Sequence, residues 1–509
     1  MRFRGSSFVV KVTDTVVVST NSSEAGQKTH AIAGLPLSTA IIYALLFFIA
    51  FWFYSTSWPN APIMEPDSGN YLRVAQDLSD FHIDQLPERA PGYPLFLLLT
   101  ESSRSPSRLL FFASLSLHFL SIWMLGAVLS RFGLRRNFVI LFGMILLLPP
   151  YVEYAGYVLS ENLAEATLVA GFASFVFWLL SKRVIWIFLS ALTVAYAALT
   201  RPTYELLAVV MAGYILVTAP ASQWTRLRWK EAVSASLLLV FGSILVLGGY
   251  SYVNYRSVGY FGVATPQLGQ HLTQKTFRVL ERLPDEYADV RETLIRGRNF
   301  YIATTQRHTG YDYIYATLPE LIKTTGLQTA ELSEYLLRLN LVLIQKAPLE
   351  YLQEIVWAFG SYWFPSSEQL ANMNSRFLQF VWAAVHFFLI GGFFLNLLLL
   401  VGTAIYIKMC VRSLPSDHQV LPKLEGVQLS GSTYGMAGTI VIYTAAITCL
   451  IQDGLPRYRL PTDALIVFML FLGTEILRRL VGIISTALIN DPSTDAAGRR
   501  DTLMAERLY

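Results

Sequence analysis

Carboxylates and arginines gather in a few short segments that border long apolar runs. The segment "MEPDSGNYLRVAQDL" (residues 64–78) carries Glu65 and Asp67, and "ERAPGYPLFLLL" (88–99) carries Arg89. A carboxylate held at a membrane surface could take part in chemistry there. An arginine beside it would suit a lipid phosphate, which it can bind through two hydrogen bonds.

Each of these residues also has a simpler interpretation. Asp67 stands at the start of a short predicted helix, whose apolar stripe is Tyr71, Leu72, Ala75 and Leu78. Its carboxylate could cap that helix, and one carboxylate could serve both purposes. Arg89 and Tyr93 sit at a break made by Pro91, Gly92 and Pro94. They could be anchors at a membrane surface.

Three further turns carry the same side-chain types. "PPYVEYAGYVLSENLAEA" places Glu153 and Glu161 at or just inside a membrane surface, with Glu165 one turn deeper. Carboxylates at membrane depth are costly and therefore indicate function, although Glu161 could also stabilise a helix start. The other two turns, "ALTRPTYELL" and "IQDGLPRYRLPTDALIVF", contribute Arg201, Glu205, Asp453, Arg457, Tyr458, Arg459 and Asp463.

The elements that hold these turns are membrane helices. Of the 509 residues, 54% are hydrophobic and only 15% charged, whereas a soluble domain carries about 25% charge. Runs of about 20 apolar residues predict an all-α polytopic membrane protein. Ten spans are expected, near 36–55, 108–130, 137–152, 161–181, 184–199, 203–219, 232–252, 378–406, 434–452 and 462–480.

The basic residues orient these spans. Lysines and arginines precede the first span and follow the second, fourth, sixth, eighth and tenth, so all clusters fall on one side. The positive-inside rule makes that side cytoplasmic, together with both termini. Because the basic residues lie mostly at span ends, the net charge of +4 does not point to nucleic acid. The two cysteines, Cys410 and Cys449, imply no disulfide framework.

The spans divide the chain into five parts. A cytoplasmic segment (1–35) precedes a transmembrane core (36–253), whose first outer loop (56–107) carries Asp67. A large outer loop (254–376) follows, then C-terminal spans (377–485) and a polar tail (486–509). Within the large loop, residues 331–364 have apolar residues at helical spacing and many aromatics, which is typical of a helix at a membrane surface.

All the charged turns therefore fall on the outer side. The cytoplasmic loops show only the basic residues that orientation demands, whereas each tight outer turn presents an acid, an arginine or both. This asymmetry predicts an outward-facing site for an anionic, partly lipidic substrate, in a multi-pass protein of the inner or plasma membrane.

The order of these motifs resembles a known family. "EPDSGNYLRVAQDL", "RAPGYPLFL", "VLSENLAEA", "LTRPTYELL", "NYRSVGYFGVAT" and "LPRYRLPTDALIVFML" follow one another as in the bacterial GT-C integral-membrane glycosyltransferases. The chain looks most like the branch of protein O-mannosyltransferases, lipid A aminoarabinose transferases and related lipopolysaccharide sugar transferases. The resemblance covers roughly residues 36–480.

The resemblance implies a reaction and roles for residues. A sugar would pass, with inversion, from a polyprenyl-phosphate donor to a lipid, glycan or protein acceptor at the extracytoplasmic face. Asp67 would be the catalytic base that deprotonates the acceptor hydroxyl, and arginines would stabilise the leaving phosphate. Glu161 is the second candidate catalytic acid. The candidate substrate-binding residues are Tyr71, Arg89, Tyr93, Glu153, Arg201, Arg457, Tyr458 and Arg459.

The chain also departs from the family. Many relatives have an adjacent acidic pair in the first loop, whereas Pro66 here separates Glu65 from Asp67. Some GT-C enzymes hold a divalent metal between the first two outer loops, and Asp67 with Glu153 or Glu161 could do so. Other members need no metal, so the sequence leaves metal use open.

Two other classes of function compete with the enzyme. A secondary transporter or lipid flippase would use buried acids and arginines as an ion-coupled pathway. Against it, the acids cluster on one side instead of at mid-membrane, and the outer loop is unusually large. A non-catalytic scaffold would not explain charge in so many tight turns.

Overall fold

The computed structural model describes most of the chain. It covers residues 31–32, 35–57, 62–80, 88–221, 229–305, 312–366, 370, 373, 375–410 and 420–489. The predicted cytoplasmic segment lies outside these ranges except for residues 31–32 and 35, as does the predicted tail from residue 490. Two strands of two residues, β1 (Ala31–Ile32) and β2 (Leu35–Pro36), form a small hairpin before the first helix.

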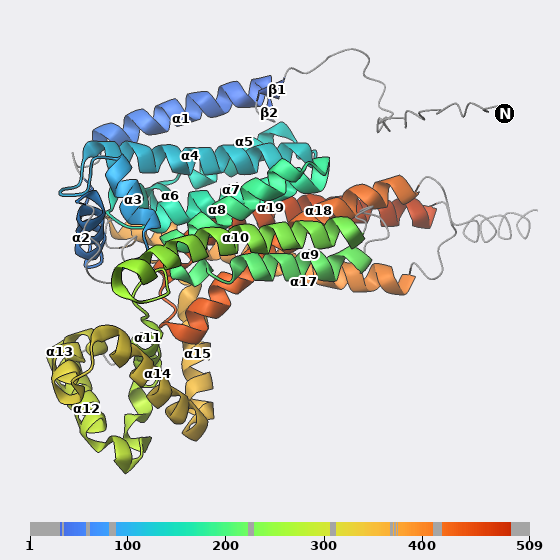
Figure 1. The fold of residues 1–509 in the computed structure, drawn as a ribbon. Helices are drawn as coiled ribbons and strands as arrows, with labels where there is room; N and C mark the ends of the chain where they lie inside the picture. The colour runs from blue at the N-terminus through green and yellow to red at the C-terminus, as the bar shows by residue number, and fades with distance from the viewer. Residues whose placement is uncertain are drawn as a thin grey trace, which may run out of the picture.

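A bundle of long helices forms the body of the molecule (Figure 1). Each of the ten predicted spans falls on one of its helices or on a pair of them. These are α1 (Leu37–Ser57), α4 (Arg108–Arg131), α5 (Arg136–Leu146) with α6 (Pro149–Val152), α7 (Glu161–Ser181), α8 (Val184–Thr200), α9 (Leu207–Ala221), α10 (Trp229–Val258), α17 (Arg376–Cys410), α18 (Val420–Ile451) and α19 (Leu460–Ile489).

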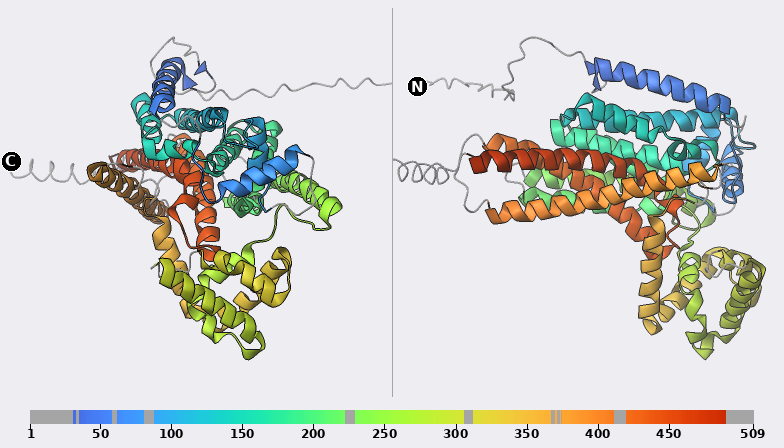
Figure 2. Two further views of the ribbon diagram at one scale, coloured as in Figure 1. Left: turned by 90° about the vertical axis from the view of Figure 1, so that its left-hand side faces the viewer. Right: turned by 180° about the vertical axis from the view of Figure 1, so that it is seen from behind.

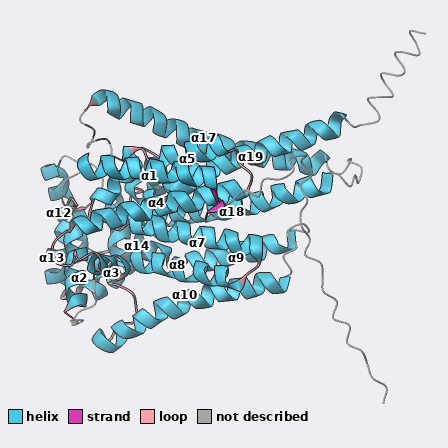
Figure 3. Cartoon of the chain, turned by 90° about the horizontal axis from the view of Figure 1, so that it is seen from above, coloured by secondary structure: helices cyan, strands magenta, loops and turns pink. Residues whose placement is uncertain are grey.

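The bundle has the composition of a multi-pass integral membrane protein. In the described residues, seven helices are long and apolar enough to cross a membrane, and the bent pair α5–α6 would be an eighth. Helix α8 is shorter, with 17 residues, so the number of ten spans stays a prediction. The outlying helix α1 is 28% buried and the central helix α7 is 83% buried. Figure 3 shows α17 and α10 along opposite edges of the bundle.

The third predicted span is broken in the middle. Its two halves, α5 and the segment Pro149–Gly156, meet at an angle of 62°. Pro149 and Pro150 follow α5 after two intervening residues, and proline has no N–H to continue the helical hydrogen bonds. The chain therefore bends within the bundle and continues into a 3₁₀ turn (Glu153–Gly156).

The first outer loop forms two short helices at one end of the bundle (Figure 1). They are α2 (Ser68–Ser79) and α3 (Gly92–Leu99), which pack against each other. The short helix predicted after Asp67 is thus present as α2, and α3 has only eight residues, too few to cross a membrane.

The large loop forms a small helical domain, which projects from this end of the bundle (Figures 1 and 2). Its helices are α11 (Leu268–Lys275), α12 (Ala288–Thr305), α13 (Tyr313–Thr325), α14 (Thr329–Lys346) and α15 (Pro348–Tyr362). The domain has its own apolar core, made by side chains that include Leu280, Leu294, Leu321 and Leu336. The end that carries α2, α3 and this domain is called the loop end below.

Two boundaries of the loop differ from the sequence prediction. Helix α10 continues to Val258, four residues past the predicted start of the loop. The predicted helical run 331–364 is two helices, because Pro348 begins a new one after Ala347. Helix α15 runs across the direction of the bundle (Figure 1) and packs through Ala358 and Tyr362 on Cys449 of α18.

Candidate functional site

Asp67 stands at the loop end, immediately before α2. The neighbouring segments hold its backbone: the hydroxyl of Ser68 donates to the Val158 carbonyl at 2.8 Å and accepts from the Glu65 N–H at 2.8 Å. Although Asp67 occupies the N-cap position, its side chain accepts no hydrogen bond from the helix. The prediction that its carboxylate caps α2 is therefore wrong, because two arginines bind that carboxylate instead.

The two arginines come from distant parts of the chain. Arg89 donates to Asp67 Oδ1 at 2.6 Å, and Arg457 forms an ion pair with Oδ2. Burial alone would raise the pKa of Asp67, but the positive charges of Arg89 and Arg457 outweigh it and hold the pKa below its usual value. Asp67 is thus ionised at neutral pH. Its side chain is 27% exposed, so a substrate can reach it.

A second ion pair lies beside the first. Arg201 Nη1 is 3.0 Å from Glu161 Oε1. The guanidinium groups of Arg201 and Arg457 lie over the ring of Tyr458, at 5.3 and 5.4 Å from its centre. These distances are typical of cation–π contacts, so the aromatic ring joins the two ion pairs.

Tyr71 completes the cluster on the side of the first loop. Its ring lies 5.2 Å from the Arg89 guanidinium, and its hydroxyl is 3.1 Å from Ser160 Oγ. Seven predicted residues thus meet, and we call them the arginine cluster: Asp67, Tyr71, Arg89, Glu161, Arg201, Arg457 and Tyr458.

Two glycines bring the turns of the cluster together. A Cβ on Gly92 would lie 2.7 Å from the backbone of Leu199, so only glycine lets α3 approach the end of α8, which precedes Arg201. Gly454, with a φ of +66°, packs on the backbone of Ala358 and begins the turn that carries Arg457.

Three predicted residues do not join the cluster. Tyr93 is 1% exposed and packs behind Tyr71, with the two ring centres 4.9 Å apart. Glu153 is buried in its 3₁₀ turn and accepts a hydrogen bond from Tyr157 at 3.3 Å. Both side chains are thus buried and lie outside the arginine cluster.

Arg459 is the third, and it corrects an expectation. It is 1% exposed, and its guanidinium donates to Asp463 at 2.7 Å and to the carbonyls of Tyr362 and Phe364 at 2.5 and 3.0 Å. Since protein atoms surround this guanidinium, Arg459 does not face a lipid phosphate. It ties the start of α19 to the end of α15.

The large loop contributes two residues that the sequence did not single out. His271 of α11 and Tyr315 of α13 lie 3.4 Å apart, and both interact electrostatically with Arg89 and Asp67. Burial and the charge of Arg89 lower the pKa of His271 to about 4, so its imidazole is neutral at pH 7. No motif marks these two positions, which reach the cluster only through the fold of the loop domain.

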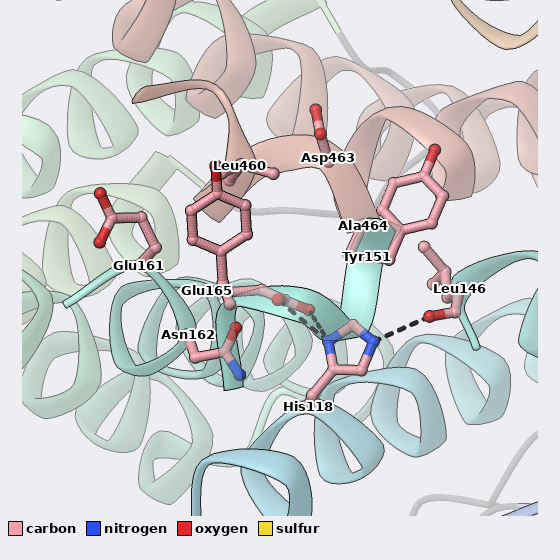
Figure 4. Close-up of a pocket in the computed structure, with 10 residues that line it drawn as sticks. His118, Leu146, Tyr151, Glu161, Asn162, Glu165, Leu460, Asp463 and Ala464 are labelled. Atoms are coloured by element: carbon pink, nitrogen blue, oxygen red, sulfur yellow. Dashed lines mark hydrogen bonds and ion pairs between the residues drawn. The ribbon is translucent and has the colours of Figure 1, made fainter. Parts of the chain in front are cut away.

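A small polar pocket lies next to Glu161, within the bundle (Figure 4). Its polar lining includes the carboxylates of Glu161, Glu165 and Asp463, the imidazole of His118 and the amide of Asn162. His118 and Glu165 contact each other, and Asp463 is the partner of Arg459. The acids at this depth are thus paired with cationic or protonated groups.

The arginine cluster suits an anion better than a metal ion. Among the described residues, no group of three or more His, Cys, Asp and Glu side chains could hold a metal. Both oxygens of Asp67 face guanidinium groups, and Glu161 faces another. Three arginines against two carboxylates leave one positive charge, which would repel a divalent cation and attract a phosphate.

No protein-family model matches the chain, and neither does any curated protein sequence. Among solved structures, the fold is similar to an archaeal oligosaccharyltransferase, AglB from Archaeoglobus fulgidus, in complex with an inhibitory peptide and a dolichol-phosphate. The TM-score is 0.47 and the identity 11%, over 86% of this chain and 50% of that one, so this chain spans half the length of AglB.

A second similar structure is ArnT from Cupriavidus metallidurans bound to undecaprenyl phosphate. The TM-score is 0.34 and the identity 14%, over 87% of this chain and 78% of that one. At these scores the function has to be argued from the site itself.

Proposed function

We propose that the protein is a membrane glycosyltransferase. It moves a sugar from a polyprenyl-phosphate donor to a hydroxyl group of a lipid, glycan or protein at the extracytoplasmic face. The observation that carries this proposal is Asp67 held between Arg89 and Arg457 at one end of a membrane bundle. A carboxylate base and several phosphate-binding groups are the two components that such a transfer needs.

The roles follow from the charges. The acceptor oxygen attacks C1 of the sugar as Asp67 takes its proton, and the bond between C1 and the phosphate oxygen breaks with inversion. The electron pair of that bond stays on the polyprenyl phosphate, whose negative charge grows. Arg89, Arg201 and Arg457 are placed to stabilise this charge, since guanidinium groups bind phosphate oxygens through paired hydrogen bonds.

Glu161 supports this arrangement from behind. Its carboxylate is 3% exposed and pairs with Arg201 at 3.0 Å. A buried carboxylate in this position keeps the guanidinium charged and fixes its direction. In this proposal Glu161 orients Arg201 toward the phosphate, and Asp67 is the base.

A binding experiment tests the phosphate site. Arg89→Gln should weaken binding of undecaprenyl phosphate about 10- to 100-fold, because a hydrogen bond to a charged group contributes about 1.5–3 kcal/mol. Binding of uncharged undecaprenol should not change. Titration of the purified protein in nanodiscs measures both dissociation constants.

Arg73→Gln is the matched control. Arg73 belongs to α2 but pairs with Glu88 at the surface, with 54% of its side chain exposed. This variant should bind undecaprenyl phosphate as the wild-type protein does. Equal affinity of the wild-type protein for the phosphate and for the alcohol would contradict the proposal. The matching activity test incubates the protein with a panel of polyprenyl-phosphate sugars and measures release of the sugar.

The pH dependence of transfer gives a second test. A base must be unprotonated, and the pKa of Asp67 is lowered, so activity is full above that pKa and falls only as pH drops through it. Wild-type kcat/KM should therefore be flat on the acid side down to about pH 5. Arg89→Gln removes a charge that lowers this pKa, so its acid limb should move to higher pH. Identical acid limbs in the two proteins would contradict the role of Asp67.

The transporter alternative predicts a different result. Reconstituted vesicles would then move a lipid-linked sugar between leaflets without cleaving it, so intact donor would appear on the opposite side. Hydrolysis or transfer of the sugar distinguishes the enzyme from the transporter.

A further inference from the structure

A side chain from a neighbouring helix stabilises the break between α5 and α6. In a continuous helix, the carbonyl of Leu146 would accept a hydrogen bond from the N–H of residue 150. Residue 150 is proline, which has no N–H, so this carbonyl loses its helical partner. His118 of α4 takes the vacant place: its Nε2 lies 2.9 Å from the Leu146 oxygen (Figure 4).

The hydrogen bonds of His118 define where its protons lie. A carbonyl oxygen can only accept, so Nε2 must carry a hydrogen. Nδ1 lies 3.1 Å from both carboxylate oxygens of Glu165, on α7. One proton is therefore shared between Nδ1 and Glu165, and the pair has no net charge. This contact fixes the ring orientation in which Nε2 donates to the break.

The break leads directly to the segment that holds Asp67. After α6 and the 3₁₀ turn, residues 156–158 pair with the first outer loop: the Ile63 N–H donates to the Gly156 carbonyl at 2.8 Å, and the Val158 N–H donates to the Ile63 carbonyl at 3.0 Å. The Val158 carbonyl then accepts from Ser68, the residue after Asp67. Through these hydrogen bonds, residues 156–158 position the loop that carries the proposed base.

We infer that His118 and Glu165 are positioning residues for Asp67. His118, oriented by Glu165, binds the Leu146 carbonyl and so fixes the angle of the break, and this angle fixes where residues 156–158 hold the first outer loop. Neither side chain touches Asp67. A base displaced by about 1 Å can lose on the order of 100-fold in rate, so a support at this distance affects turnover. The kinetic part of this inference rests on the proposed function.

The test compares four variants. His118→Leu removes the donor to Leu146, whereas His118→Gln keeps an amide that can donate to it. Glu165→Leu keeps the imidazole but removes the group that orients it. Asn162→Leu is the control, because Asn162 lines the same pocket and bonds to the Ser114 carbonyl of α4 at 3.3 Å, without contact to the break.

Hydrogen exchange gives the first measurement and needs no substrate. In His118→Leu, amides of residues 62–71 should exchange at least tenfold faster than in the wild-type protein. His118→Gln should restore most of the protection, and Asn162→Leu should leave these amides unchanged. Unaltered exchange over residues 62–71 in folded His118→Leu would overturn the inference. If His118→Leu fails to fold, the exchange of residues 62–71 in Glu165→Leu is measured instead: faster exchange would support the inference, and unaltered exchange would overturn it.

Kinetics give the second measurement, per molecule of folded protein. The kcat of His118→Leu should fall about 10- to 100-fold, while its affinity for undecaprenyl phosphate should stay within about twofold. If His118 served only the folding of the protein, the substitution would lower the yield of folded protein and leave kcat unchanged. That result would also overturn the inference. If wild-type protein transfers no sugar, the proposed function fails, and the exchange experiment still decides the role of His118.

Discussion

Asp67→Asn should abolish sugar transfer while the protein stays folded. An amide cannot take the proton of the acceptor hydroxyl, and loss of a general base typically costs about 10²–10⁴-fold in rate. Transfer of radiolabelled sugar from a polyprenyl-phosphate donor, per molecule of folded protein, measures this loss. The wild-type side chain is ionised and partly exposed at the loop end, as a base must be.

Asp77→Asn is the matched control for this variant. Asp77 lies on the exposed side of α2, ten residues along the chain, and should tolerate the same change with full activity. Asp67→Asn should also bind undecaprenyl phosphate more tightly than the wild-type protein, because the lipid phosphate no longer competes with a carboxylate for Arg89 and Arg457. Retained transfer would remove Asp67 from the mechanism. Loss of both transfer and lipid binding would indicate damage to the fold.

Arg459→Met should strongly destabilise the protein. The substitution leaves the buried carboxylate of Asp463 without its partner and two carbonyls without their donor. Breaking one half of a buried ion pair typically costs about 3–5 kcal/mol. Thermal unfolding in detergent should show a large drop in melting temperature. Arg459→Met combined with Asp463→Asn should recover part of it, because no unpaired charge then remains.

Arg457→Gln gives the contrast. Arg457 lies two residues away but is partly exposed and paired with Asp67. This variant should keep its melting temperature and lose affinity for undecaprenyl phosphate. A stable Arg459→Met with weakened lipid binding would show that Arg459, against its buried position, belongs to the phosphate site.

The sequence predicts the helices and the end at which the site forms. Apolar runs mark the spans, and the basic clusters assign Asp67, Arg89, Glu161, Arg201 and Arg457 to one side of the membrane. Short turns leave little room for these side chains to separate, so their convergence follows from the span pattern. Motif order adds a role for Asp67, which neither burial nor spacing could supply.

Other features depend on contacts that local sequence does not encode. Arg457 lies in the 3₁₀ turn (Pro456–Tyr458) and Arg459 directly follows it, and only the packing of α15 decides which of them points outward. Local sequence predicts that Asp67 caps a helix. In the fold its carboxylate instead pairs with Arg457, from the far end of the chain. His118 is a lone histidine in an apolar span, and its role depends on the carbonyl that Pro150 leaves free.

The ion pair between Asp67 and Arg457 joins residues 390 positions apart. During biosynthesis the first helix enters the bilayer long before the turn ahead of the last one has been made. Until that final hairpin is inserted, Asp67 has only Arg89 as a partner, and Tyr458 is missing between the two ion pairs. A nascent or truncated chain therefore has no complete centre, and completion of insertion is itself the step that assembles it.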